Sequence, residues 1–197
     1  MTRRTETVPP DYFAGIYASD ADPWRFTSSD YERDKYAATL AALPRARYRS
    51  AFEPACSIGV FTHALAGRCD RLFATDLVPS AVDAASARCA DRPNVEIRQG
   101  AVPADWPEGR FDLIVLSEFL YFLAPPDLAV LVRRIGDAIE PGGDIVLVHW
   151  LGVTDYPQSG DAVAEAVIAQ AAPFAGLQHQ SRTAEYRIDV LRAGSTT

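Results

Sequence analysis

Short apolar runs alternate with longer amphipathic segments from residue 51 onward. This alternation is typical of a parallel sheet whose strands are joined by helices. Five strands are predicted, at residues 51–55, 71–76, 95–99, 112–117 and 144–150. The helices predicted between them span residues 59–66, 79–90 and 125–139. We therefore expect an α/β fold with helices on both faces of a mostly parallel sheet.

Proline and glycine mark the ends of these helices. Pro79 and Pro125 stand in first-turn positions, where the missing N–H of proline costs nothing. Glu140 is followed by Pro141-Gly142-Gly143, in which proline cannot extend a helix and glycine allows a left-handed turn. The sequence thus predicts that the third helix stops here and turns into the strand at 144–150.

The two ends of the chain read differently from the middle. After residue 150 a helix is predicted at 161–171, followed by two runs at 176–180 and 186–191. Their short separation favours an antiparallel hairpin, which makes seven strands in all. Ahead of the first strand, helices are predicted at 11–18 and 29–43. We expect a single domain, 1–197, with a helical lid at 1–48 and an α/β core at 49–197.

The composition of the chain argues against two kinds of binding partner, nucleic acids and membranes. The chain of 197 residues is 48% hydrophobic and carries a formal net charge of -7, which argues against a nucleic-acid partner. The dense basic run Arg45, Arg47 and Arg49 is interpreted as a solvated turn. No apolar run reaches the roughly 18 to 20 residues that a membrane span needs. No export signal is recognised either, so we expect a cytoplasmic protein with no membrane partner, as a monomer or homodimer.

The cysteines indicate neither a disulfide framework nor a metal site. Cys56, Cys69 and Cys89 are odd in number and have no C-x-x-C spacing. We expect no metal.

A candidate ligand loop follows the first predicted strand. Residues 53–59 combine an acid with small residues at Ala55, Ser57 and Gly59, directly before a helix. Such a loop lets backbone N–H groups and a helix N-terminus approach a ligand closely. Asp76 closes the second strand, 21 positions after Ala55, which is the separation at which a carboxylate reaches a ribose. The pair predicts a cofactor of the nucleoside type.

Spacing also favours one nucleoside cofactor over another. A dinucleotide site wants the pattern G-x-G-x-x-G, and its third glycine position, counted from Ala55, is occupied here by Val60. A branched side chain there would crowd a diphosphate, so S-adenosylmethionine suits the loop better. Val60 and the segment at 112–118 accordingly disfavour a nicotinamide-dependent oxidoreductase.

At this point the chain resembles the class I S-adenosylmethionine-dependent methyltransferases, and within them the nodulation-protein-S-like branch. The general likeness covers the loop at 53–59, the acid Asp76, the strand at 111–118 with the residues 119–123 after it, and the Pro-Gly-Gly segment at 141–143. The branch-level likeness rests on residues 22–26, 31–33, 35–36 and 43–45, together with 149–150, 155–157 and 160–161. The resemblance implies a Rossmann-like fold.

The resemblance also implies the cofactor and its contacts. S-adenosylmethionine would bind and leave as S-adenosylhomocysteine. The implied cofactor-binding residues are Trp24, Glu53, Ala55, Cys56, Ser57, Asp76, Leu77, Ala101, Val102 and Ser117. The chain departs from the family where glycines give way to Ala55 and Ser57. A common adenine-binding acid is also replaced by Ala101.

Candidate catalytic residues lie where the fourth and fifth strands end. Glu118 and His149 could each accept a proton from an amine, since both follow the carboxyl edge of the sheet. The alternatives are a turn cap for Glu118 and a structural role for His149. Tyr121 and Trp150 could form the wall of an acceptor pocket, because an aromatic face suits a cationic amine or a sugar ring. Trp24 is interpreted as part of the lid or as an anchor for the first helix.

The predicted function is N-methylation of a small amine, such as an amino sugar or a natural-product intermediate. Two alternatives stay open at this stage. One is an O-methyltransferase acting on a small molecule, and the other is a non-catalytic protein that binds S-adenosylmethionine.

Overall fold

The computed structural model describes residues 2–195, so the ends of the expected domain, residue 1 and residues 196–197, lie outside the described residues. Its internal contacts divide the chain into two compact units. The N-terminal unit is Pro9–Ala101, and the C-terminal unit combines residues 2–8 with residues 102–195. The expectation of one domain with a lid at 1–48 stays a prediction.

The N-terminal unit contains three parallel strands with β2 in the middle. They are β1 (Ala51–Pro54), β2 (Leu72–Asp76) and β3 (Val95–Gln99). Its helices are α1 (Pro10–Ser19), α2 (Asp30–Ala42), α3 (Val60–Leu65) and α4 (Pro79–Arg88), with a 3-10 turn, η1, at Ala66–Arg68. Helix α4 contacts β2 and β3, and α3 lies against α4. Strands β1 and β2 therefore each lead through a short loop into a helix, α3 and α4 respectively.

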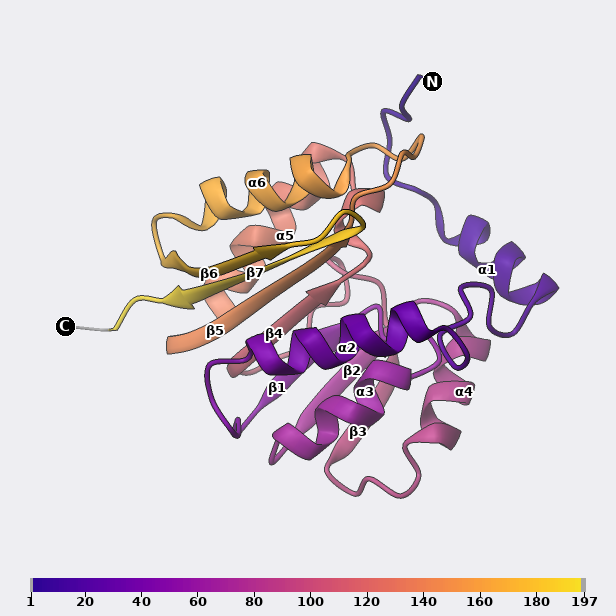
Figure 1. Ribbon diagram of the computed structural model, residues 1–197, viewed down its shortest axis with the longest axis horizontal. Coiled ribbons are helices and arrows are strands. Elements are labelled where there is room, and N and C mark those ends of the chain that lie inside the picture. The colour runs from indigo at the N-terminus through magenta and orange to yellow at the C-terminus, as the bar shows by residue number, and fades with distance from the viewer. Residues whose placement is uncertain (1, 196–197) are drawn as a thin grey trace. The chain divides into compact units, whose positions relative to one another are not determined.

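The C-terminal unit contains four strands and two long helices (Figure 1). They are β4 (Phe111–Ser117), β5 (Ile139–Trp150), β6 (Ala175–Arg182) and β7 (Tyr186–Ala193), with α5 (Pro125–Ala138), α6 (Gly160–Ala171) and the 3-10 turn η2 (Leu120–Phe122). Strands β4 and β5 are parallel, whereas β7 is antiparallel to both β5 and β6. The predicted C-terminal hairpin is confirmed.

The seven strands have the order β3-β2-β1-β4-β5-β7-β6. The Rossmann-like α/β class with a mostly parallel sheet and an antiparallel C-terminal pair is thus confirmed. Most predicted helices and strands agree with the observed ones to within one or two residues.

The start of the fifth strand was predicted wrongly. Helix α5 does stop at Ala138, but β5 begins at once, at Ile139, and not at residue 144. Ile139 pairs with Phe111, and the register then shifts before Asp144 pairs with Leu113. The Pro-Gly-Gly segment is absorbed as an irregularity within the strand, where proline lacks a ladder N–H and Gly142 adopts a φ of +72°.

The core of the C-terminal unit follows from these patterns. The central residues of β4, Leu113, Ile114, Val115 and Leu116, are all fully buried. Helix α5 buries one stripe at spacings of three and four, formed by Leu128, Leu131, Val132, Ile135 and Ala138. A continuous apolar strand and an amphipathic helix are what a sheet buried beneath helices requires.

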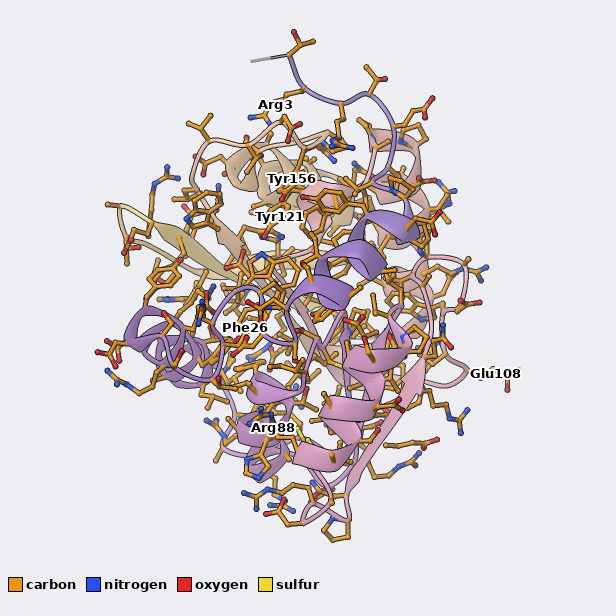
Figure 2. The ribbon with its side chains drawn as sticks, turned by 90° about the vertical axis from the view of Figure 1, so that its right-hand side faces the viewer. Arg3, Phe26, Arg88, Glu108, Tyr121 and Tyr156 are labelled. Carbon is orange, nitrogen blue, oxygen red and sulfur yellow. The ribbon has the colours of Figure 1, made fainter. Side chains whose placement is uncertain are left out.

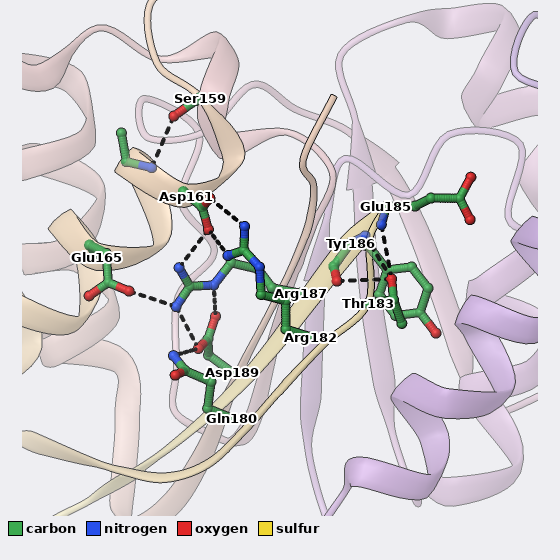
Figure 3. A network of polar contacts seen from close by, with 11 residues as sticks. Ser159, Asp161, Glu165, Gln180, Arg182, Thr183, Glu185, Tyr186, Arg187 and Asp189 are labelled. Carbon is green, nitrogen blue, oxygen red and sulfur yellow. Dashed lines mark hydrogen bonds and ion pairs between the residues drawn. The ribbon is translucent and has the colours of Figure 1, made fainter. Parts of the chain in front are cut away.

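A charged network joins the hairpin to α6 (Figure 3). Arg187 on β7 is 3% exposed, and its Nε donates to Oδ2 of Asp189 at 2.8 Å. Its Nη1 donates to Asp161 at 3.0 Å, and its Nη2 lies 2.8 Å from Glu165. Because Asp189 is fully buried, its charge depends on the guanidinium of Arg187 for compensation.

We predict that Arg187→Met lowers the free energy of unfolding by about 3–5 kcal/mol, because it leaves the Asp189 carboxylate buried without its partner. The matched control is Arg182→Met, which removes an exposed guanidinium from the same Asp161 and should cost far less, because exposed ion pairs contribute little to stability. Urea denaturation of both variants measures the difference. Similar losses in the two variants would contradict the assigned role of Arg187.

Candidate functional site

The loop after β1 adopts a left-handed conformation at three of its residues. The φ angle is +58° at Ala55, +52° at Ser57 and +75° at Gly59. Glycine adopts this conformation freely, whereas a residue with a Cβ atom pays roughly 1–2 kcal/mol. A Cβ atom at Gly59 would also lie 2.9 Å from Ala85, so α3 can approach α4 only with glycine at this position. Two of the three left-handed positions are therefore strained.

Asp76 closes this loop from the end of β2. Its Oδ2 accepts the N–H of Ser57 at 2.9 Å, and its Oδ1 accepts the N–H of Val78 at 2.9 Å. Burial raises the pKa of Asp76, while these backbone donors act against the shift. The Asp76 carboxylate thus orients the peptide of Ser57 in the loop after β1.

Glu53 is a buried acid beneath the same loop. It lies on β1 with 3% of its surface exposed, and its Oε2 has no hydrogen-bond partner among the described residues. Burial raises the pKa of Glu53 from 4.5 to about 8, although the Thr62 hydroxyl opposes the shift. The carboxyl group is therefore largely protonated at neutral pH.

Other predicted cofactor residues in this unit have mixed surroundings. Cys56 is 5% exposed and belongs to an apolar cluster with Ala74 and Ala85, so its side chain points into the core. Leu77 follows Asp76, and its carbonyl accepts from Gln99 at 3.2 Å. Ala101 follows β3 in the coil at the end of the unit. Their cofactor contacts stay predictions.

The Trp24 segment forms a compact turn between α1 and α2. Asp22 holds it, since its carboxylate accepts the N–H of Phe26 at 2.8 Å and both the N–H and the hydroxyl of Thr27. The Trp24 ring lies 5.7 Å from the ring of Phe26, a residue labelled in Figure 2, and is 37% exposed. Trp24 also contacts the edge of the Tyr17 ring on α1, at 5.6 Å.

Tyr17 is a polar neighbour of the loop that the sequence did not identify. Its hydroxyl lies 2.5 Å from the hydroxyl of Ser57, at the second left-handed position. Aromatic residues at helical spacing usually pack, so the sequence alone assigns Tyr17 no polar role. Its position directly before the Trp24 turn was the available signal.

In the C-terminal unit, Glu118 occupies a strained position after β4. Its φ is +61°, and its N–H donates to the carbonyl of Val148 at 2.9 Å, continuing the pairing of Ser117 with Val148. Its Oε2 accepts both the Trp150 N–H at 2.8 Å and the Tyr121 hydroxyl at 3.1 Å. Strain of this kind concentrates at functional sites. Glu118 thus contacts two other predicted site residues, Tyr121 and Trp150.

Aromatic rings pack against Tyr121, whose hydroxyl binds this carboxylate. Tyr121 on η2 lies edge-on to His149 at 5.9 Å, and His149 on β5 is fully buried. Tyr156 stacks on Tyr121 with ring centroids 5.7 Å apart and an interplanar angle of 8° (Figure 2). From the sequence, residues 155–157 contributed only to the branch-level resemblance. The structure adds that Tyr156 stacks on Tyr121.

Glycines allow the chain to pass close to Trp150. A Cβ atom at Gly152 would fall 1.9 Å from the indole, and one at Gly160 would fall 2.0 Å from the Trp150 carbonyl. The indole itself is 39% exposed. The segment that carries Tyr156 is therefore held against Trp150.

The first residues of the chain also hold this segment. The N–H of Arg4 donates to Asp155 at 2.8 Å, and the Arg3 guanidinium donates to the Tyr156 carbonyl at 3.0 Å. The N–H of Val8 donates to the carbonyl of Phe122 on η2 at 2.9 Å. Residues 3–8 thus connect the two loops that carry the aromatic rings.

Across residues 2–195, no three or more His, Cys, Asp or Glu residues are grouped as metal ligands would be. In the same range, no helix has both the length and the apolar character needed to cross a bilayer.

The sequence of this chain is similar to those of known proteins. The family model for nodulation protein S (NodS) matches residues 17–148. Nodulation protein S of Rhizobium tropici is 34% identical over 129 residues, which cover 64% of this chain and 53% of that protein. The chain therefore spans about half the length of this relative.

Solved structures are also similar. A Pseudomonas syringae protein called a putative methyltransferase is 38% identical, with a TM-score of 0.72, and the match covers 82% of this chain and 98% of that one. The N-methyltransferase NodS of Bradyrhizobium japonicum WM9, in complex with S-adenosyl-l-homocysteine, has a TM-score of 0.82 at 22% identity. That match covers 93% of this chain and 98% of the other, and it supports the fold.

We predict that Ala55→Gly raises the free energy of unfolding by about 0.5–1 kcal/mol, because glycine relieves the positive φ. The control is Ala84→Gly on the exposed surface of α4, which should lower it by about 1 kcal/mol. Chemical denaturation gives both values. The opposite signs of the same substitution test the strained conformation of the loop.

We predict a pH dependence of stability that arises from Glu53. Its folded pKa of about 8 exceeds the unfolded value of 4.5, so the folded state holds an extra proton between these values. Stability is then greatest below the lower value and falls as the pH rises toward 8, by at most about 1.4 kcal/mol per unit. Glu53→Gln keeps the neutral shape and should flatten this part of the profile. Free energies of unfolding that change equally with pH in both proteins between pH 5 and 8 would contradict the assignment.

Proposed function

Because this chain belongs to the nodulation protein S family, we propose that it transfers a methyl group from S-adenosylmethionine to the nitrogen of a small amine. The family match over residues 17–148 supports the methyltransferase activity and the cofactor. An amino sugar or an amine-bearing natural-product intermediate is the proposed class of acceptor.

The N-terminal unit has features that fit such a cofactor. Each oxygen of Asp76 accepts one backbone N–H, and an ionised carboxylate offers about four lone-pair sites. Asp76 therefore retains capacity for a ribose hydroxyl beyond its backbone donors. The small residues Ala55, Ser57 and Gly59 let the backbone approach a ligand closely. The roles of Val102 and Ser117 in cofactor binding stay predictions.

When bound, S-adenosylmethionine supplies a methyl carbon that its sulfonium activates, so that a nitrogen lone pair can attack this carbon in line and the sulfur can leave as a thioether. The protein therefore mainly has to align the amine and remove its proton. An alkylamine is protonated in neutral solution, so a proton acceptor of this chain has to act before or during the transfer.

The observation that carries the proposal is the fixed carboxylate of Glu118. Its Oε2 is held by the Trp150 N–H and the Tyr121 hydroxyl, which keeps the group in one orientation. Glu118 is partly exposed, whereas His149 is fully buried, so Glu118 is the better placed of the two to meet an ammonium group. A negative charge beside the ring of Tyr121 and the half-exposed indole of Trp150 suits a cationic acceptor. His149 supports the Tyr121 ring by edge contact.

The test is transfer of an isotope-labelled methyl group to a panel of amines and matched alcohols. We predict that Glu118→Gln lowers kcat by about 100-fold with protonated alkylamines, because the general base is lost. The defect should shrink for a weakly basic amine that is already neutral at the assay pH. Binding of S-adenosylhomocysteine, measured by calorimetry, should change less than about twofold, since Gln can still accept both hydrogen bonds.

The control is Glu185→Gln, which changes an exposed acid in the turn between β6 and β7 and should leave the rates unaltered. Transfer to the alcohols and not to the amines would replace the proposal by O-methylation. Cofactor binding without turnover on any acceptor would indicate a non-catalytic protein. An equal defect of Glu118→Gln on both kinds of amine would remove Glu118 from the proton transfer.

A further inference from the structure

The hydroxyl of Tyr17 makes a specific contact with the cofactor loop. It lies 2.5 Å from the hydroxyl of Ser57, although the two residues are 40 positions apart in the sequence. Tyr17 comes from α1, the first helix of the N-terminal unit, and its ring also contacts Trp24. A helix that precedes the sheet thereby reaches the loop between β1 and α3.

Ser57 is placed so that this contact has consequences for the ligand site. Its backbone is left-handed, with a φ of +52°, and its N–H donates to Asp76 at 2.9 Å. The same residue thus binds Tyr17 through its side chain and Asp76 through its backbone. Glycine would take this conformation with less strain but has no hydroxyl to offer.

The protonation of Tyr17 agrees with a role as hydrogen-bond partner. Burial, followed by the nearby charge of Asp76, raises the pKa of Tyr17 well above its usual range, although the Ser57 hydroxyl opposes the shift. The hydroxyl is therefore protonated throughout the physiological range. It can donate to Ser57 or accept from it.

We propose that Tyr17 is a positioning residue of the cofactor site, which acts through Ser57 to hold the loop peptide in the orientation that reaches Asp76. Tyr17 and Ser57 form a hydroxyl pair that anchors α1 to the loop. The inference uses the binding of S-adenosylmethionine from the proposed function but not the identity of the acceptor.

The test is a double-mutant cycle on the affinity for S-adenosylhomocysteine. Calorimetry on the full chain compares wild type, Tyr17→Phe, Ser57→Ala and the double variant. Each single variant should weaken binding by about fivefold to tenfold, in line with the loss of one hydrogen bond. The double variant should be no weaker than either single one, because both remove the same bond.

Two further comparisons separate positioning from packing. Tyr12→Phe changes the other tyrosine of α1, whose ring lies edge-on to Phe13, and should bind S-adenosylhomocysteine like wild type. In turnover, Tyr17→Phe should raise the KM for S-adenosylmethionine and leave the KM for the acceptor unchanged. A merely packed tyrosine would instead change the thermal midpoint without this selective change in KM.

Independent losses that multiply in the double variant would overturn the proposal, as would wild-type affinity in Tyr17→Phe. If Tyr17→Phe folds poorly, Ser57→Ala tests the same bond from the other side. Wild type that fails to bind S-adenosylhomocysteine would refute the cofactor and this inference together. Wild-type binding with no amine methylation would refute only the proposed acceptor.

Discussion

The bond from the Ser57 N–H to the Asp76 carboxylate is the interaction on which the loop between β1 and α3 depends. It joins the loop after β1 to the end of the neighbouring strand β2, and it forms while Ser57 has a φ of +52°. Parallel strands bring their carboxyl ends to one edge, which is why an acid at the end of β2 can reach this loop. The close approach of Gly59 to Ala85 then sets where α3 begins.

The C-terminal unit uses a comparable arrangement around Glu118. This residue also follows a parallel strand, and its own φ is positive. Its carboxylate accepts the backbone N–H of Trp150 at the end of the next strand. In both units a residue with a Cβ atom has a positive φ that glycine would adopt with less strain. The strain is offset by hydrogen bonds that also orient the polar groups of the candidate site, which is how strained positions persist in folded proteins.

The sequence predicted much of this arrangement but not all of it. Periodicity and helix-end residues located the strands and helices, and the acids at strand ends, Asp76 and Glu118, were recognised from their positions alone. The start of β5 was missed because Pro-Gly-Gly is usually a turn, whereas pairing of Ile139 with Phe111 draws it into the strand. Tyr17 and Tyr156 were missed as site residues because an aromatic side chain reads as packing until its hydroxyl or ring is seen to meet a partner.

By itself the sequence determined the order of elements, the α/β class and which acids terminate which strands, because these depend on local periodicity and spacing. The tertiary structure decided which donor meets which acceptor. Tyr17 and Ser57 are 40 positions apart, and Glu118 and Trp150 are 32 apart, so no local pattern encodes their hydrogen bonds. The left-handed conformations of Ala55, Ser57 and Glu118 were likewise settled by tertiary contacts, since local preference alone would favour a negative φ at each of them.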